Sequence, residues 1–327
     1  MVLTEFRILV AGLYRRGNFL NKKISILVTG ATGFLGKHLI QFLKEQPGLC
    51  VFGISKRGGV VGDLSVQSVD LSVGEEVSSW QKETPTFDTI FHLAAIVPTS
   101  FYSEDTERSF FTNLHVTQNA LSIAISNRAS FIYASSCSVY GTTETIPITE
   151  STLPRPDNAY SLAKYVGELM CGVVNARQGI RTTILRINAP YGPFYTAPTV
   201  LNIFLRAALE SKDITLLGSG ERTQDFTYID DVVQALWLAF RKGESGIYNI
   251  ASGQAVTMRE LAETIVAVVP RTRSRITYAD RPDTQEGYRG VFAIEKARYR
   301  LGYEPGTSLR EGLRACLAAI RDKKSEP

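Results

Sequence analysis

The sequence predicts an α/β fold: a doubly wound parallel sheet, followed by a smaller C-terminal α/β lobe that closes over the sheet. Three observations support this fold class. Short β-branched runs alternate with helical patterns up to about residue 187, glycines cluster after the first run, and prolines and glycines break the pattern from about residue 188 onward. Alternating strands and helices form parallel sheets with helices on both faces.

The expected elements follow in order along the chain. The first strand runs from Ile24 to Thr29 and ends in glycines, and a helical pattern then extends from Gly36 to about Glu45. The second strand runs from Leu49 to Ile54. Further strands are expected near residues 89–93, 130–134 and 182–186, and a third strand closes at Asp70 and Leu71.

Length and composition exclude several classes of protein. The chain has 327 residues, of which 44% are hydrophobic and 21% charged, the balance of an ordinary globular protein. About 150 residues per domain gives a prior of about two domains or one large one. The net charge of +4 is too small to indicate a nucleic-acid partner. No apolar stretch approaches the ~18 residues that a membrane span needs.

The cysteines and histidines predict no metal site. Cys50, Cys137, Cys171 and Cys316 form no C-x-x-C pair, and the chain has only three histidines. Zinc and redox motifs therefore have no support. This use of cysteine is typical of a reducing compartment, so we expect a cytoplasmic protein.

Gly30, Gly33 and Gly36 predict a phosphate-binding loop for a dinucleotide. The first allows a tight turn, the second lets the backbone approach a pyrophosphate, and the third lets the helix pack closely on the strand. The N-terminus of that helix offers N–H groups and a partial positive charge to the phosphates. The alternative, an ordinary glycine-rich turn, is disfavoured by the strand before it and the helix after it. The other loop residues expected to contact the cofactor are Thr32, Phe34 and Leu35.

The end of the second strand indicates which dinucleotide is bound. An acidic residue in this place usually holds the ribose 2′-hydroxyl of NAD, whereas this chain has Ser55-Lys56-Arg57. Two cations suit a 2′-phosphate, so NADP is preferred over NAD; the alternative is that both cations are solvated. Farther on, Asp70, followed by Leu71, could accept a hydrogen bond from the adenine amino group, and Asp63 is a rival for that role.

Tyr160 and Lys164 are the predicted chemical centre. They are four residues apart and therefore lie on one face of a helix. An ammonium near a phenol lowers the phenol pKa from ~10, so the tyrosine could exchange a proton with a carbinol oxygen at neutral pH. A serine cluster after the expected strand, Ser135 to Ser138, could bond the same oxygen. Tyr-x-x-x-Lys alone is more often two surface residues, but the upstream glycine loop favours the catalytic interpretation.

Taken in order, these motifs resemble the extended short-chain dehydrogenases/reductases of the NAD-dependent epimerase/dehydratase group, from about residue 24 to 317. The further residues that carry the resemblance are His92-Leu93-Ala94-Ala95, Asn113, Tyr191-Gly192-Pro193, Asp225 to Asp231, Tyr248-Asn249-Ile250 and Leu301 to Pro305. The resemblance implies a Rossmann domain that binds NAD(P). It also implies a C-terminal lobe that binds a nucleotide-activated sugar.

The resemblance also implies the parts of the chain and its assembly. We expect an N-terminal extension at residues 1–22, the Rossmann domain at 23–187 and mainly the substrate lobe at 188–322, with about 224–250 returning to the first domain. Residues 323–327 are expected to be a frayed tail. A homodimer would form from the helices near residues 107–126 and 160–177, as a four-helix bundle.

Individual roles follow from the same resemblance. Ser136 would be the catalytic hydroxyl and Tyr160 the acid/base, and Lys164 would also hold the nicotinamide ribose. The remaining residues implied to line or support the cofactor cleft are Leu93, Ala94, Ala95, Asn113 and Pro190.

The two residues after Ser136 distinguish the reactions of the group. Its 4,6-dehydratases have Asp-Glu there and its decarboxylating members keep the Glu, whereas this chain has Cys137 and Ser138. Dehydration is therefore not expected. The 3,5-epimerase/reductase branch has its Cys at the second position and a His after Gly-Pro, where this chain has Phe194. Reduction of a 4-keto sugar by NADPH and 4-epimerisation remain, and the two cations slightly favour reduction.

The substrate side departs from the pattern of the group. The usual Asn before Tyr-Gly-Pro is displaced to Asn188, and the usual Arg before Asp-Phe is Gln224, with Arg222 two residues upstream. Guanidinium groups donate two parallel hydrogen bonds to a phosphate, so Arg222 and Arg281 are the expected diphosphate contacts. The alternative for Arg222 is a solvated loop residue, and Arg289 competes with Arg281. Ser138 completes the predicted substrate contacts.

Two other functions compete with a nucleotide-sugar enzyme. The first is a reductase of a smaller carbonyl compound, which the displaced Asn188 and the missing Arg at position 224 would suit. The second is a non-catalytic NADP-binding sensor. Such sensors tend to lose the Tyr or the Lys, and this chain keeps both Tyr160 and Lys164.

Overall fold

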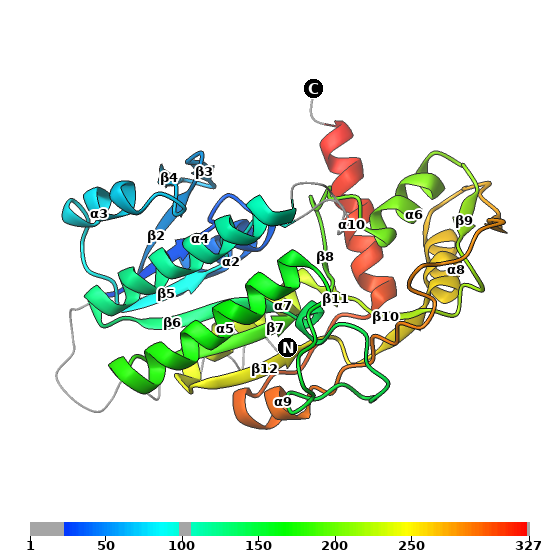
Figure 1. Ribbon diagram of the computed structural model, residues 1–327. Helices are drawn as coiled ribbons and strands as arrows, with labels where there is room; N and C mark the ends of the chain where they lie inside the picture. The colour runs from blue at the N-terminus through cyan, green and yellow to red at the C-terminus, as the bar shows by residue number, and fades with distance from the viewer. Residues whose placement is uncertain (1–22, 98–105, 326–327) are drawn as a thin grey trace.

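The large sheet has the strand order β12-β7-β6-β5-β1-β2-β4-β3 (Figure 1). The computed structural model describes residues 23–97 and 106–325. Every neighbouring pair is parallel except β3 and β4. The strands are β1 (Ile24–Thr29), β2 (Leu49–Ser55), β3 (Gly59–Val61), β4 (Leu64–Ser68), β5 (Thr89–His92), β6 (Ser130–Ser136), β7 (Thr182–Ile187) and β12 (Gly246–Ile250). The predicted doubly wound α/β fold is confirmed.

Helices cover both faces of this sheet (Figure 1). The helices are α2 (Phe34–Lys44) and α7 (Ile229–Lys242) on one face, and α3 (Gly74–Lys82), α4 (Thr106–Asn127) and α5 (Ala159–Gln178) on the other. Alternate residues of β1 serve two separate cores: Ile26 and Val28 pack with α2 and α7, and Leu27 packs with α3, α4 and α5. This alternation reflects the two-residue period of a strand that is buried on both faces.

The C-terminal lobe lies beyond one end of the sheet, on the right in Figure 1. Its strands pair in three small sheets, and its helices α6, α8 and α10 surround them. The elements are β8 (Pro190–Tyr191), α6 (Val200–Leu209), β9 (Ile214–Leu216), β10 (Thr223–Asp225), β11 (Thr227–Tyr228), β13 (Ala255–Thr257), α8 (Met258–Val268), β14 (Ile276–Tyr278) and α10 (Leu309–Ser325). Helix α9 (Glu295–Leu301) instead packs on β12 and α7 of the large sheet. Within the range 224–250, α7 and β12 lie with the large sheet.

Three details differ from the expectations or fall outside the structure. The third strand is a hairpin of β3 and β4 that turns at Gly62 in the left-handed region (φ 60°) and ends at Ser68, short of Asp70. Helix α10 continues to Ser325, into the segment expected to be a tail. The N-terminal extension, residues 1–22, lies outside the described residues.

Candidate active site

The order of the strands reverses between β1 and β5, and the glycine loop follows β1 at this point. In open α/β sheets, ligands bind in the crevice outside such a switch point. Gly30 has φ 66°, and a Cβ there would lie 2.7 Å from the backbone nitrogen of Ala94. A Cβ on Gly36 would lie 2.3 Å from the Gly30 carbonyl oxygen. Both positions therefore require glycine, which keeps the turn tight and the loop backbone bare.

Helix α2 begins at Phe34, with Gly33 as its N-cap. No side chain caps this end, and its first turn contains no acidic residue. The first N–H groups of a helix have no partner within the helix and favour an anion. Thr32, Leu35 and the other loop residues thus form a cradle whose charge and shape fit the pyrophosphate of NAD(P).

The end of β2, where the sequence analysis expects the adenosine, contains a salt bridge that it did not foresee. The ammonium of Lys56 lies 2.8 Å from Oδ2 of Asp70, and Oδ1 of Asp70 accepts hydrogen bonds from the backbone and hydroxyl of Ser72. Burial opposes ionisation of Asp70, but the hydrogen bonds from Lys56 and Ser72 outweigh it and lower the pKa of Asp70. Arg57 is exposed beside this pair, and Ser55 is buried at the end of β2.

Asp63 and Leu71, the other residues considered for the adenine contact, make contacts elsewhere in the protein. Asp63, in the β3–β4 turn, pairs with Lys44 at the end of α2 and is exposed. The side chain of Leu71 is buried in the core beneath α3 and α4, and its carbonyl oxygen accepts a hydrogen bond from Asn119. Asp70 is therefore a better candidate than Asp63 for a contact with the cofactor. The side chain of Leu71 is not accessible to a cofactor, because it is buried in the core.

The segment after β5 is held in place from α4. Leu93, Ala94 and Ala95 are half-buried next to the glycine loop. The side-chain oxygen of Asn113 accepts a hydrogen bond from the Ile96 backbone at 2.7 Å, and its amide donates to the Ile96 carbonyl at 3.0 Å. This bidentate contact fixes the wall of the crevice.

Behind that wall, His92 is fully buried at the end of β5. Its Nδ1 lies 2.8 Å from the hydroxyl of Thr29, and its Nε2 lies 3.3 Å from the hydroxyl of Thr117. Burial, aided by the nearby Lys164 ammonium, lowers the pKa of His92 well below its usual value. The imidazole is thus neutral and links β1, β5 and α4.

The structure brings Ser136, Tyr160 and Lys164 together at the carboxyl end of β6. Asn158 caps α5 by accepting a hydrogen bond from the Ser161 backbone at 2.9 Å, which places Tyr160 in the first turn. One turn later, Lys164 donates a 2.7 Å hydrogen bond to the Ala134 carbonyl, two residues before Ser136. Its ammonium lies 5.8 Å from the centroid of the Tyr160 ring.

The expected lowering of the Tyr160 pKa is wrong for this structure. Burial raises the pKa of Tyr160, and the nearby phenol of Tyr195 adds to the rise, although a hydrogen bond with Ser136 opposes it. The lysine does not compensate because its ammonium is directed at a backbone carbonyl. Burial also lowers the pKa of Lys164 to about 8. At neutral pH, Tyr160 is therefore a protonated phenol beside a lysine close to its titration point.

The residues after Ser136 form a short 3-10 helix, η2 (Cys137–Tyr140). The hydroxyl of Ser138 donates to that of Ser136 at 2.9 Å. Cys137 is buried, its thiol donates to the Arg186 carbonyl at 3.1 Å, and burial raises its pKa well above the usual value. Cys137 is therefore a neutral structural thiol.

A buried ion pair next to these residues was missed by the sequence analysis. Nη2 of Arg186 on β7 lies 2.6 Å from Oε2 of Glu168 on α5, and both side chains are only 2% exposed. Glu168 also accepts a hydrogen bond from Ser135. The available signal was the spacing Tyr160, Lys164, Glu168, which repeats every four residues and marks one face of a helix.

The predicted substrate residues are largely occupied by contacts within the lobe. The amide of Asn188 donates to the Asp225 carbonyl at 2.6 Å, and Gln224 lies beside it on β10. The guanidinium of Arg222 donates to Asp283 at 2.8 Å and to Gln285 at 3.2 Å. These contacts join the strands of the lobe to the loop after β14.

The other arginines differ in their surroundings. Arg281 is exposed, and Arg289 donates to the backbone carbonyls of Glu286 and Tyr288. Tyr288, which the sequence analysis did not single out, lies in the same loop and is half-buried. Burial raises its pKa, and both Cys137 and Arg222 are close enough to influence it. Pro190 is half-buried and pairs with β11.

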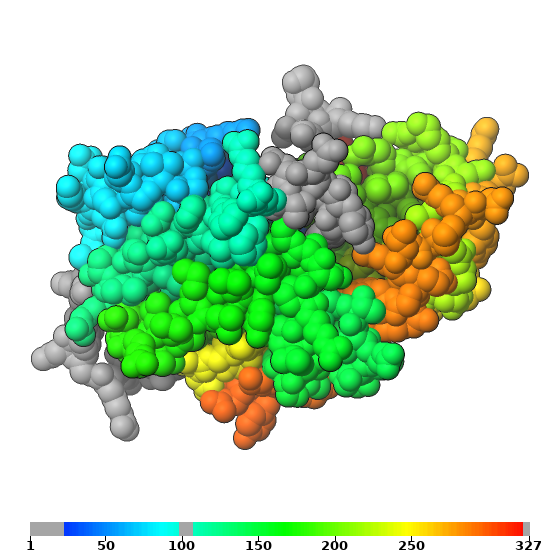
Figure 2. Space-filling model, in the orientation of Figure 1, coloured from blue at the N-terminus to red at the C-terminus, as the bar shows by residue number. Residues whose placement is uncertain are grey.

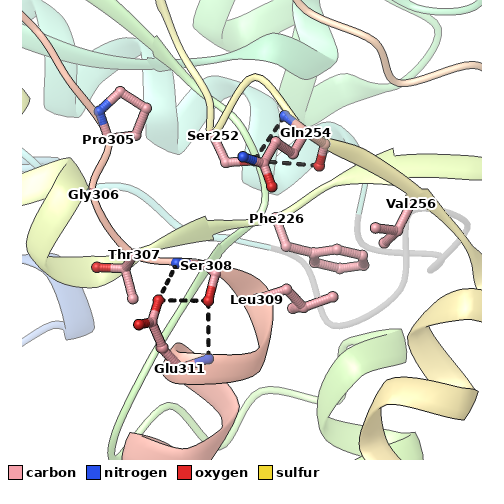
Figure 3. Close-up of a pocket in the computed structure, with 10 residues that line it drawn as sticks. All are labelled: Phe226, Ser252, Gln254, Val256, Pro305, Gly306, Thr307, Ser308, Leu309 and Glu311. Atoms are coloured by element: carbon pink, nitrogen blue, oxygen red, sulfur yellow. Dashed lines mark hydrogen bonds between the residues drawn. The ribbon is translucent and has the colours of Figure 1, made fainter.

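A separate cavity of about 150 Å³ lies where the loop after β12 meets the start of α10 (Figure 3). Its walls include Phe226, Gln254 and Glu311, and contain none of the predicted catalytic or cofactor residues. The hydroxyl and the backbone N–H of Ser308 both donate hydrogen bonds to Glu311, so these polar groups at the start of α10 are paired with each other.

The described part of the chain contains neither a helix that could span a membrane nor a cluster of metal-ligating side chains. Over residues 23–97 and 106–325, no helix combines the length and apolarity that crossing a membrane requires. Within the same residues, no three or more His, Cys, Asp or Glu side chains gather in a way that could hold a metal ion.

Comparison with known proteins gives matches over both the sheet and the lobe. The model of the NAD dependent epimerase/dehydratase family matches residues 26–251. The protein named uncharacterized UDP-glucose epimerase YtcB, from Bacillus subtilis (strain 168), is 29% identical over 308 residues, covering 89% of this chain and 96% of that protein. UDP-glucuronic acid decarboxylase 6 of Arabidopsis thaliana is 29% identical over 316 residues, covering 91% and 89%.

Two solved structures have the same fold over nearly the whole chain. The UDP-glucose 4-epimerase of Thermotoga maritima, solved with UDP-glucose, is 27% identical with a TM-score of 0.84, covering 92% of this chain and 100% of that one. The UDP-glucuronic acid 4-epimerase of Bacillus cereus, solved with UDP-glucuronic acid and NAD, is 27% identical with a TM-score of 0.79 and the same two coverages, 92% and 100%.

Proposed function

Because the chain belongs to the NAD-dependent epimerase/dehydratase family, we propose that it is an enzyme that exchanges hydride at carbon 4 of a UDP-sugar. The observation that carries this proposal is the convergence of Ser136, Tyr160 and Lys164 beside the glycine loop. The substrate class rests on the names of the similar proteins, which are UDP-sugar epimerases and decarboxylases. When bound, the nicotinamide cofactor supplies the hydride chemistry, and the protein supplies orientation and proton transfer.

Tyr160 is the proposed acid/base for the 4-oxygen of the sugar. In the oxidation half of a 4-epimerisation, Tyr160 would have to accept the 4-hydroxyl proton as the phenolate. In the reduction half, the protonated phenol returns that proton to the 4-oxygen, and the raised pKa of Tyr160 favours this second half. The Ser136 hydroxyl, which already bonds Tyr160, would bond the same oxygen. Lys164 lies one helical turn further along α5, where its ammonium bonds the Ala134 carbonyl and stays 5.8 Å from the centroid of the Tyr160 ring.

The proposal excludes water elimination and decarboxylation as the main reaction. The positions after Ser136 offer a neutral buried thiol on Cys137 and a hydroxyl on Ser138, neither of which can act as a carboxylate base. The reactions that remain are those that need only hydride exchange and a single acid/base. That requirement is met by 4-epimerisation and by reduction of a 4-keto sugar.

Between these two reactions, the structure removes part of the reason for preferring reduction. That preference came from two cations suited to NADPH, and one of them, Lys56, already pairs with Asp70. We therefore put 4-epimerisation first and retain reduction as the second candidate, which exposed Arg57 supports. A smaller carbonyl substrate remains the alternative at the level of substrate class, because Asn188 and Arg222 have partners within the lobe.

Native mass spectrometry and ligand-dependent melting test the proposal together. A tightly retained NAD(H) in the purified protein, with conversion of one UDP-sugar into its 4-epimer, is the expected result. An empty site that binds NADPH better than NADH would favour the reductase. UDP should raise the melting temperature, because a ligand that binds only the folded state stabilises it. No shift with UDP, dTDP, GDP or CDP would count against any nucleotide-sugar substrate.

The choice of dinucleotide leads to a separate prediction for Lys56 and Arg57. Replacing both with alanine should weaken NADP binding by about tenfold and leave NAD binding within about twofold, because only NADP carries the charged 2′-phosphate. Isothermal titration with both cofactors measures this. Lys82→Ala, a basic residue in the last turn of α3, is the control. Equal weakening of both cofactors would show that these cations do not read the 2′-position.

We also propose a homodimer formed through α4 and α5, which lie side by side on the face shown in Figure 2. Phe111 on α4 and Leu162, Leu169 and Val173 on α5 are large apolar residues that this chain leaves exposed. Exposed apolar patches of this kind mark interfaces. Leu169→Glu with Val173→Glu should shift sedimentation from dimer to monomer. A wild-type protein that sediments as a monomer would refute the proposal.

Localisation remains a proposal as well. All four cysteines are free thiols in the structure, and three of them, Cys137, Cys171 and Cys316, are buried. Unpaired thiols are typical of a reducing compartment, which supports a cytoplasmic enzyme. Fractionation of the source cells tests this directly: recovery with the secreted or membrane fraction would contradict it.

A further inference from the structure

Glu168 occupies a position that the proposed chemistry leaves unexplained. Its carboxylate is almost fully buried, although burying a charge is costly unless it is paired and hydrogen-bonded. One oxygen accepts from the Ser135 hydroxyl at 2.5 Å and from Arg186 Nε at 2.9 Å, and the other accepts from Arg186 Nη2 at 2.6 Å. The pair is therefore bidentate, and a third side chain completes it.

These contacts connect α5 and β6, which carry the catalytic residues, to the neighbouring strand β7. Glu168 follows Tyr160 and Lys164 on α5, Ser135 directly precedes Ser136 on β6, and Arg186 lies on β7. A shift of α5 along the sheet would thus require the carboxylate to leave both partners. Because a misplacement of about 1 Å can cost a hundredfold in rate, such a brace bears on catalysis even without touching the substrate.

The carboxylate also differs in charge from the other groups that face Lys164. These are Tyr160 and Cys171 on α5, Tyr133 on β6 and His92 on β5. All four are neutral near pH 7, because burial raises the pKa of the phenols and the thiol and lowers that of the imidazole. Burial lowers the pKa of Lys164, and the negative charge of Glu168 opposes this effect.

We propose that Glu168 is a positioning residue, which holds the catalytic lysine in place and in its charged form. Arg186 and Ser135 in turn hold the carboxylate. The role as a catalytic aid rests on the proposed function, whereas the effect on Lys164 itself does not. The two can therefore be tested apart.

The test is Glu168→Gln, which keeps the shape and one acceptor but removes the charge. Loss of a nearby opposite charge lowers the pKa of an ammonium, so the Lys164 titration should move down by about one pH unit from its position in the wild type. Carbon-13 NMR of labelled lysine measures this titration directly, with Lys164→Met used to assign the signal. The basic limb of the turnover profile on a UDP-sugar should move down by the same amount.

A matched control separates charge from stability. Asp231 on α7 is another buried carboxylate, which accepts hydrogen bonds from the backbones of Gly306 and Thr307. Asp231→Asn should lower the melting temperature without moving the Lys164 titration. If Glu168→Gln does not fold because Arg186 is left unpaired, the double variant with Arg186→Gln removes both charges and should show a smaller downward shift.

Four outcomes would contradict the inference or the proposed function. A folded Glu168→Gln protein with an unchanged Lys164 titration would overturn the inference, and so would an unchanged titration in the double variant. A shifted titration with an unshifted basic limb would leave Glu168 a structural residue and also overturn the positioning role. A shifted titration in a protein that converts no UDP-sugar would sink the proposed function and leave the effect on Lys164 standing.

Discussion

Tyr160→Phe should lower kcat by about 10²- to 10⁴-fold, the usual contribution of a positioned acid/base. The phenyl ring keeps the packing of the phenol and removes the proton that the site transfers. Cofactor affinity should stay within about twofold, because the crevice is built by the glycine loop and the segment after β5. Steady-state kinetics with a UDP-sugar, together with cofactor titration, measure the two effects separately.

A matched control for this variant lies on the same helix. Tyr165→Phe removes a phenol hydroxyl from another face of α5, where Tyr165 lines a groove with Leu169 and Val173. It should leave kcat unchanged. If Tyr160→Phe also retains full turnover, Tyr160 is not the acid/base, and the Ser136 hydroxyl becomes the group to examine.

Gly30→Ala should lower NAD(P) affinity by at least about a hundredfold. The left-handed backbone at this position costs an alanine about 1–2 kcal/mol, and its Cβ would lie 2.7 Å from the Ala94 nitrogen. Ala94 belongs to the wall of the crevice, so relief of the contact must move either the glycine loop or that wall. Cofactor titration of the folded variant is the measurement.

Gly172 on α5 offers the control for the glycine prediction. A Cβ added there meets no atom within 4 Å, so Gly172→Ala should bind cofactor normally. Its stability should rise by roughly 0.5–1 kcal/mol, since alanine is the better helix former. Normal cofactor affinity in Gly30→Ala would mean that the loop is plastic and that its close approach to Ala94 is unimportant.

The parts of the fold that the sequence predicted are those determined by local pattern. The buried strand Ile24–Thr29 and the glycines after it can be recognised within about a dozen residues, because strand period and turn chemistry are local properties. The sequence analysis missed the hairpin at Gly62. Three glycines, Gly58, Gly59 and Gly62, were the available signal, and all three adopt positive φ in the structure. Glycines mark where a turn is allowed, but the pairing of β3 with β4 is decided by packing.

The candidate site was less predictable where contacts are long-range. Spacing alone brought Tyr160 and Lys164 together, but no spacing rule connects Glu168 to Ser135 and Arg186, or Arg222 to Asp283. Those partners belong to strands and loops that meet only in the folded sheet and lobe. The predicted direction of the Tyr160 pKa shift was wrong for a related reason. The four-residue spacing on a helix shows that a cation is near the phenol, but it does not show that the phenol is buried.

The last strand of the large sheet has a consequence for how the chain can be divided. β12 pairs with β7, every residue of which is buried, and β12 is separated from β7 in sequence by the lobe strands and helix α7. A fragment that stopped at residue 187 would expose the edge of β7 that β12 covers, and the unpaired backbone groups of that edge would be an aggregation hazard. The nucleotide-binding half is thus not a module that can be cut out or exchanged at that boundary. Any graft of the lobe onto a related protein must carry α7 and β12 with the sheet to which they belong.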